Sequence, residues 1–153
     1  MSNGEGIPAL ECRVSSNVVS PSIVLIPADL ASIAVVRAAI FSALRDRGWD
    51  DEECRRVTLA TSEAVANAVE HGSGPGELVE VVHQVTEDDA MVRVLDSGCG
   101  ARWEPPASAP QASPDAPRGR GLAIIAALTD NVEFRHAGRG TELRLDFVRA
   151  AFA

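Results

Sequence analysis

Lysine is absent from the sequence, and all 14 basic residues are arginines. A P-loop requires a lysine that reaches the β- and γ-phosphates of its nucleotide, so a Walker-type phosphate site is excluded. Basic residues are also outnumbered, because 22 acidic residues leave a formal net charge of −8. Binding to DNA or RNA depends on a surplus of positive charge that neutralises phosphates. We therefore expect no direct nucleic acid partner and favour a basic or neutral protein partner.

Paired cysteines and long apolar runs are also missing. Cys12, Cys54 and Cys99 lie far apart, without the CxxC spacing of zinc sites or redox pairs. We expect them to be reduced thiols in a cytoplasmic protein. No run reaches the ~18 to 20 apolar residues of a membrane span, and the opening MSNGEG lacks the basic region of a signal peptide. We therefore expect no membrane association.

The length of 153 residues fits a single domain, and 46% hydrophobic residues can supply one core. Residues 1–11 contain Gly, Ser, Asn and Pro, and we expect them to form a flexible tail. Residues 12–149 are then the domain. Within it, residues 101–118 are rich in Pro, Ala and Ser and show no periodicity, which is typical of a functional lid or a disordered loop.

The pattern of apolar residues predicts a two-layer fold. A helix is expected from the capping residue Asp29 to Gly48, with Leu30 and Phe41 among the apolar residues that face a sheet, and a second helix from Asp50 to Gly72. The remaining elements are strands at 23–26, 78–85, 91–95, 132–135 and 142–148, and a helix at 121–129. Because regular βαβ alternation is missing, we expect an α/β (α+β) two-layer sandwich, a mixed, mostly antiparallel sheet with helices on one face.

Three short motifs carry groups that could perform chemistry, and the first lies on the second helix. Glu63, Asn67 and His71 follow one another at i, i+4 and i+8 and so share one face with a row of alanines. A carboxylate and an amide are costly to bury unless they are paired, which favours a functional site. Polar faces with this spacing are also common on helices that face water, so both interpretations stay open. For His71 we favour capping or packing at the helix end.

The second motif is a strand that ends in Asp96 and continues with Gly98 and Gly100. Glycines let the backbone approach a ligand closely, and a carboxylate can accept a hydrogen bond from an exocyclic amine such as that of adenine. The third motif, residues 118–122, reads RGRGL at the start of a helix. Free N–H groups at a helix start, together with two arginines, could hold a triphosphate. Taken alone, the second motif is explained equally well by an ordinary turn at the end of a strand. For the third motif taken alone, an ordinary glycine-rich helix start with arginines facing solvent is the favoured interpretation.

In this order the three motifs resemble the N box, G1 box and G2 box of the GHKL ATPases, which share the Bergerat ATP-binding fold. The segment SEAVANAVEHG at 62–72 is similar to the corresponding segment of the anti-sigma factor serine/threonine-protein kinases within that superfamily. The short chain without a phosphoacceptor helix also resembles these kinases. The stretch IPADLASIAVVRAAIFSAL also resembles the opening strand and first helix of this family. The motifs span residues 58–141, and the likeness covers nearly all of the chain beyond the tail.

The resemblance implies a role for each matching residue. Glu63 is the general base, and Asn67 ligates a Mg²⁺ held against the phosphates of ATP. Asp96 is the carboxylate that recognises adenine. In relatives an arginine two residues ahead of the G2 glycines meets the γ-phosphate, whereas Arg118 and Arg120 stand elsewhere here and either could act. The other implied nucleotide-binding positions are Gly98, Gly100, Gly119, Gly121, Leu122 and Thr141.

The family function implied is that of an ATP-binding anti-sigma factor and serine kinase. Such a protein phosphorylates an anti-anti-sigma protein of the STAS type and sequesters a sigma factor, and a homodimer is possible. One alternative is a nucleotide-binding regulatory module that docks on a phosphatase or regulator without significant kinase activity. Another is the detached catalytic domain of a two-component sensor, which the short length and the lack of a phosphoacceptor helix disfavour.

Overall fold

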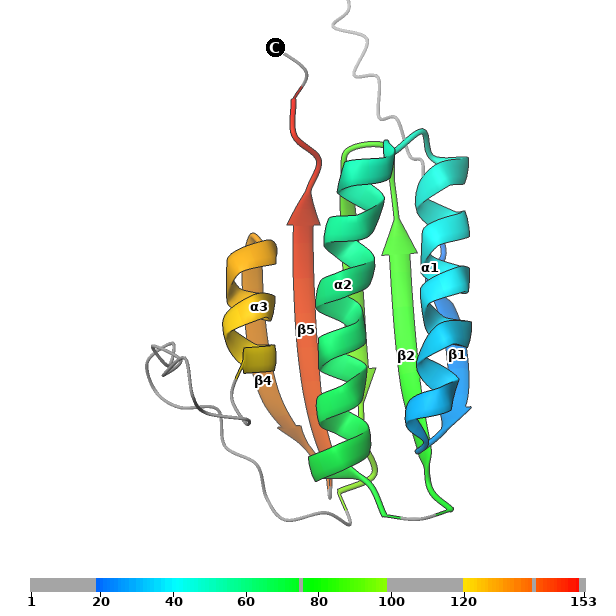
Figure 1. The fold of residues 1–153 in the computed structure, drawn as a ribbon, viewed down its shortest axis with the longest axis vertical. Coiled ribbons are helices and arrows are strands. Elements are labelled where there is room, and N and C mark those ends of the chain that lie inside the picture. The colour runs from blue at the N-terminus through cyan, green and yellow to red at the C-terminus, as the bar shows by residue number, and fades with distance from the viewer. Residues whose placement is uncertain (1–18, 75, 99–119, 139, 152–153) are drawn as a thin grey trace, which may run out of the picture.

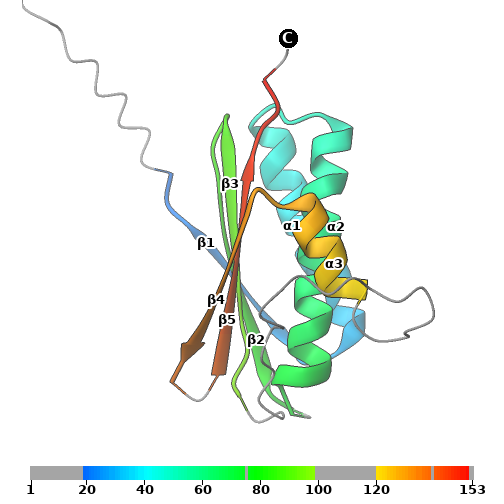
Figure 2. The same ribbon diagram turned by 90° about the vertical axis from the view of Figure 1, so that its left-hand side faces the viewer.

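The computed structural model describes residues 19–74, 76–98, 120–138 and 140–151. These residues form two layers, with the helices packed against one face of a five-stranded sheet (Figures 1 and 2). The strand order is β1-β2-β3-β5-β4, and every neighbouring pair is antiparallel. The expected two-layer sandwich is therefore confirmed, and the described strands contain no parallel pair. No helix among these residues is long and apolar enough to cross a bilayer.

The sheet follows the predicted strands closely because side chains on them alternate between two faces. On the inner face, Val92 and Val94 of β3 lie beside Leu145 and Leu143 of β5, and all four are buried. One antiparallel hairpin is formed by β2 and β3, and another by β4 and β5. The strands are β1 (Ser22–Pro27), β2 (Leu78–Val85), β3 (Asp89–Leu95), β4 (Asn131–Ala137) and β5 (Gly140–Val148).

The first helical region begins at the predicted cap, since Asp29 accepts a hydrogen bond from the Ala31 N–H at 2.9 Å. A 3₁₀ turn (Leu30–Ser32) precedes α1 (Ile33–Asp46). The prediction that Leu30 and Phe41 face the sheet is wrong, because they are 50% and 40% exposed. The 3₁₀ turn changes the direction of Leu30. Phe41 lies about 100° around the helix axis from its neighbour Ile40, which is one of the buried residues of α1.

The second helix is α2 (Asp51–Asn67), and the side chain of Asp50 caps it by accepting from the Glu53 N–H at 2.9 Å. The expected α-helix to Gly72 is interrupted, because Ala68–Gly72 forms a π-helical turn. Such turns are rare and occur frequently at functional sites. The carbonyl of Gly72 accepts a hydrogen bond from the Gly98 N–H at 3.0 Å, so the wide turn ends beside the chain that leaves β3.

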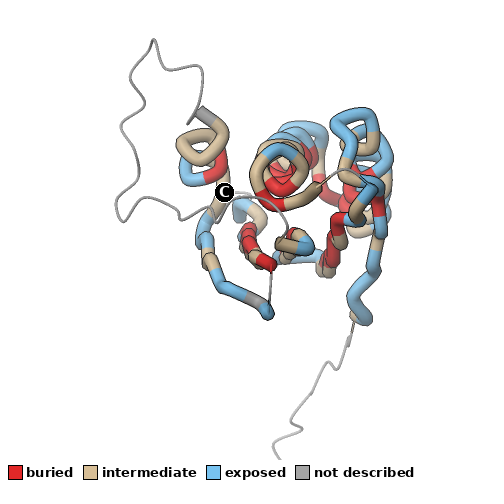
Figure 3. The backbone as a smooth tube through the Cα atoms, turned by 90° about the horizontal axis from the view of Figure 1, so that it is seen from below, coloured by how far each residue is buried: buried red, intermediate tan, exposed pale blue. Residues whose placement is uncertain are grey.

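The core lies between the helices and the sheet, where the buried backbone is concentrated in Figure 3. Its largest member, Trp49, is fully buried and donates its indole N–H to the Thr86 carbonyl at 2.9 Å, so its one polar group is paired. Burial of each large apolar side chain stabilises the fold by about 1.5–3 kcal/mol. The third helix, α3 (Arg120–Leu128), packs mainly on α2 and also contacts β4.

Candidate functional site

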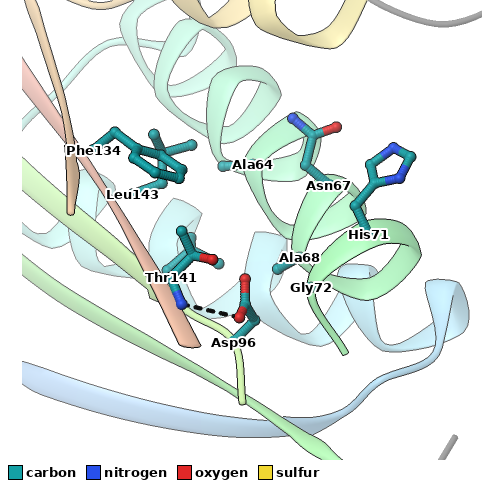
Figure 4. A pocket seen from close by; sticks show the side chains of 10 residues that line it. Ala64, Asn67, Ala68, His71, Gly72, Asp96, Phe134, Thr141 and Leu143 are labelled. Atoms are coloured by element: carbon teal, nitrogen blue, oxygen red, sulfur yellow. Dashed lines mark hydrogen bonds between the residues drawn. The ribbon is translucent and has the colours of Figure 1, made fainter. Parts of the chain in front are cut away.

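A hollow lies between the C-terminal end of α2 and the adjoining ends of β3 and β5 (Figure 4). Its enclosed volume is only about 20 Å³, and further space beside it is open to solvent. Ligand pockets commonly measure about 300–1,000 Å³, so the hollow is small for a nucleotide site. We call it the Asp96 hollow; its walls are Ala64, Asn67, Ala68, His71, Gly72, Val94, Asp96, Phe134, Thr141 and Leu143.

Asp96 and Thr141 form the floor of the Asp96 hollow on the sheet side. The Thr141 N–H donates to Asp96 Oδ1 at 3.0 Å (Figure 4), and the Asp96 N–H donates to the Thr141 carbonyl at 3.0 Å. Burial raises the pKa of the Asp96 carboxyl above its ordinary value, although the hydrogen bonds from Thr141 and Gly98 oppose this change. The carboxylate is thus partly removed from water, an environment in which a further donor from a ligand is favourable.

Two glycines that were not among the predicted site residues make room for Asp96. A Cβ added at Gly72 would collide with the Asp96 carboxylate, and one added at Gly140 would collide with the Asp96 backbone carbonyl. Their only signal in the sequence is adjacency, since Gly72 follows the N-box helix and Gly140 precedes Thr141. Gly98, which was predicted, has a φ of 77°, a value that side chains rarely allow. Backbone at three separate places is therefore shaped around one carboxylate.

Glu63 and Asn67 meet the start of α3 on the helix side. A Cβ added at Gly121 would lie 3.0 Å from Glu63 Oε2 and 3.5 Å from Asn67 Oδ1, so only glycine fits comfortably there. The side-chain amide nitrogen of Asn67 is buried without a hydrogen-bond partner among the described residues. Buried polar groups are normally paired, and this one suits a ligand. Asn67 also lines the Asp96 hollow and so joins the two halves of the site.

The start of α3 supplies the third predicted element of the site. Helix N-termini present unpaired N–H groups and a partial positive charge, which favour phosphate binding. Gly121 and Leu122 lie in the first turn of α3, and Leu122 packs against the core. A carboxylate, an amide and a helix start therefore converge beside the Asp96 hollow, an arrangement suited to a nucleotide with its base on Asp96 and its phosphates toward α3.

The sequence matches the histidine kinase-like ATPase domain over residues 26–147, which is most of the chain. The chain belongs to this family. The family assignment implies ATP binding, and it confirms the resemblance to GHKL ATPases carried by the three motifs. The fit of the site to ATP rests on observations within the chain itself, namely the partly buried Asp96 carboxylate, the Asn67 amide nitrogen without a partner among the described residues, and the close approach of Glu63 and Asn67 to Gly121.

Similar proteins agree with this placement of the histidine kinase-like ATPase domain. A curated relative, the anti-sigma F factor of Clostridium acetobutylicum, is 31% identical over 117 residues, which cover 73% of this chain and 80% of the relative. The crystal structure of the RsbU and RsbW domains of Rv1364c from Mycobacterium tuberculosis has a TM-score of 0.62 at 24% identity. That match covers 86% of this chain and 34% of the solved chain, so this chain spans about a third of its length and shares its fold.

Several predicted positions of the ATPase domain lie outside the described residues. They are Gly100, Arg118 and Gly119, the side chain of Arg120, Cys99 and the expected lid at 101–118. Within the described residues, Glu63 and Asn67 lie beside Gly121, while Asn67, Asp96 and Thr141 line the Asp96 hollow. The Gly98 N–H donates to the carbonyl of Gly72, another residue of that hollow.

His71 lines the Asp96 hollow, on the side of α2 in Figure 4, and lies 3.9 Å from the Glu70 carboxylate. The apolar walls Val94, Phe134 and Leu143 were not singled out as site residues, because in the sequence they are ordinary strand residues. Phe134 reaches the hollow from β4 across its partner strand β5, where it pairs with Leu143. The order of the strands in the sheet places Phe134 beside the hollow, and no short sequence motif indicates this position.

Proposed function

We propose that this ATPase domain is an anti-sigma factor and serine kinase. It binds ATP with Mg²⁺, transfers the γ-phosphoryl group to a serine of a STAS-type anti-anti-sigma protein, and sequesters a sigma factor. The observation that carries the proposal is the meeting of Glu63 and Asn67 with Gly121 beside the hollow that holds Asp96. The relative named anti-sigma F factor supports the regulatory part of the role.

The chain's own residues divide the work between binding and proton transfer. Asp96 accepts from the adenine amine, and the N–H groups at the start of α3 bind phosphate oxygens. Asn67 supplies an amide oxygen for a magnesium ion, and this ion, when bound, neutralises phosphate charge. Magnesium bound with a nucleotide usually keeps several waters and takes phosphate oxygens as further ligands, so a single amide oxygen from the protein would be sufficient here.

Glu63 performs the one proton transfer that the reaction needs. The hydroxyl oxygen of the substrate serine forms a bond to the γ-phosphorus, the bond from that phosphorus to the β,γ-bridging oxygen breaks, and ADP leaves. The hydroxyl proton passes to the Glu63 carboxylate. Glu63 lies one helical turn before Asn67 on α2, so the base and the proposed metal ligand are held by the same rigid element.

The experiment compares wild type with Glu63→Gln, using γ-labelled ATP, magnesium and purified STAS-domain proteins. General acid–base catalysis contributes about 10²–10⁴-fold, so we expect transfer to fall by at least about 100-fold. ATP affinity measured by calorimetry should change by less than about threefold, because the substitution keeps the shape of the side chain and the proposed contacts to ATP are made by other residues.

Glu70→Gln is the matched control, since Glu70 is exposed on the turn that follows α2. It should transfer phosphate at the wild-type rate. Equal rates of phosphoryl transfer by wild type and Glu63→Gln would show that Glu63 is not the general base. Tight ATP binding without transfer to any STAS protein would instead identify the domain as a nucleotide-binding regulatory module.

A further inference from the structure

Arg56 of α2 joins three elements at the end of the molecule away from the Asp96 hollow. Its Nη1 donates to the Leu128 carbonyl at 3.1 Å and to Asp130 Oδ2 at 3.2 Å. Its Nη2 donates to Glu53 Oε2 at 2.9 Å and to the Val148 carbonyl at 2.8 Å. The guanidinium carbon also lies 5.6 Å from the centre of the Phe147 ring. One side chain therefore holds α2, the end of α3 and the end of β5 together.

The contacts require the planar fork of arginine. Two nitrogens each serve two acceptors, and Nε is buried without a partner among the described residues. A lysine would present a single ammonium group, which cannot reach acceptors on both sides in the same way. The Leu128 carbonyl is one of the last in α3, and such carbonyls lack a partner within their own helix. The positive charge of Arg56 is also favourable at this negative end of the helix.

Arg56 and the catalytic residues occupy opposite ends of the same contact between helices. Glu63 and Asn67 follow Arg56 at i+7 and i+11, positions that return to one face of an α-helix. Arg56 holds the last residue of α3, whereas Glu63 and Asn67 meet Gly121 in its first turn. The two helices thus run antiparallel, and α3 is only nine residues long. Its position along α2 is defined at one end by Arg56 and at the other by Gly121.

We infer that Arg56 is a positioning residue that sets the register of α3 along α2 and thereby places the phosphate-binding start of α3 against Glu63 and Asn67. Because α3 packs mainly on α2, loss of this anchor lets the short helix shift along its neighbour. The adenine side of the site would stay in place, because Asp96 and Thr141 are held by the hydrogen bonds between the ends of β3 and β5. The inference rests on the proposed ATP site.

The test compares the affinities of ATP and of adenosine for wild type, Arg56→Lys and Arg56→Gln, by calorimetry or ligand competition in magnesium buffer. We expect the ATP affinity of both variants to fall about tenfold, with adenosine affinity changed by less than about twofold. Arg55→Gln is the control, because Arg55 is the exposed neighbour on the same helix. It should keep both affinities. Circular dichroism should confirm that each variant is folded at the temperature used.

Asp130→Asn covers the case in which an Arg56 variant does not fold. It weakens one acceptor of Arg56 and keeps an oxygen for the Val148 N–H, which donates to Asp130 at 2.7 Å. It should lower ATP affinity in the same selective way, by a smaller factor. Equal losses for ATP and adenosine, or no loss in folded variants, would overturn the positioning role while leaving the ATP site intact. Wild type that binds no ATP would overturn both proposals.

Discussion

Asp96 shows how one side chain is prepared by its neighbours for a single ligand group. Gly72 and Gly140 leave room for it, Thr141 donates to one of its oxygens, and burial raises its pKa. A buried carboxylate that lacks enough donors is costly, and this cost can be recovered when a ligand supplies one. The amine of adenine is such a donor. Its hydrogen bond can be accepted only by a carboxyl oxygen that carries no proton.

Asp96 should therefore make ATP binding dependent on pH. We expect ATP affinity to fall as the pH decreases through the pKa of Asp96, which is raised above its ordinary value of 3.8, because a protonated carboxyl loses acceptor capacity. Calorimetric titrations across this range should show the fall in wild type. Asp96→Asn should bind about 10–100-fold more weakly at neutral pH, the cost of a charged hydrogen bond. Its affinity should be nearly flat with pH, and parallel profiles for the two proteins would contradict the assignment.

At the scale of the element, α2 combines residues of the core, the proposed catalytic residue Glu63 and the proposed anchor for α3, Arg56. Its buried face includes Val57, Ala60 and Ala64, and its polar residues stand beside this face. The helix begins at a capped end and finishes in a π-helical turn that leads to Gly72. The geometry of the site thus depends on how firmly both ends of this one helix are held.

The N-cap of α2 should contribute measurably to stability. Asp50→Ala removes the acceptor of the Glu53 N–H and should lower the free energy of unfolding by about 1 kcal/mol. Urea unfolding followed by circular dichroism measures this change. Glu52→Ala is the control, because Glu52 is exposed in the same turn and should cost less. Equal losses in the two variants would show that charge near the helix start, and not the cap, accounts for the effect.

At the scale of the whole molecule, His83 should make the free energy of unfolding depend on pH. It lies on the inner face of β2, is 6% exposed, and its Nδ1 is buried without a partner among the described residues. Burial lowers the pKa of His83 below its ordinary value of 6.5. In the pH range between the two values the unfolded chain binds a proton at this residue and the folded chain does not. The free energy of unfolding therefore decreases as the pH falls below about 6.5 toward the lowered pKa.

Replacement of His83 should reduce this dependence. His83→Leu cannot bind a proton, so its free energy of unfolding should vary less with pH than that of wild type between pH about 6.5 and the lowered pKa. Urea titrations at several pH values give the slope. His136→Gln, at an exposed position on β4, should keep the wild-type slope. A wild-type slope in His83→Leu would show that other groups cause the pH dependence.

Much of the fold and part of the site follow from local sequence alone. Asp29 caps its helix as predicted, and the second helix begins at Asp50 as predicted, because helix starts depend on residues two or three positions away. The alternation of apolar residues predicts the strands, because it depends only on backbone geometry. The order of Glu63, Asn67 and Asp96 indicated the family through short motifs, each contained within one element or at its end.

Only the tertiary structure decided the remaining features. Gly72 and Gly140 matter because they meet Asp96, and Arg56 matters because it meets the ends of α3 and β5. Leu30 and Phe41 are exposed because a 3₁₀ turn and the width of the buried stripe determine which side faces the sheet. The sequence by itself determined each element and its polar groups, since these follow from neighbouring residues. The assembly of the site required packing between residues distant along the chain, which no local pattern encodes.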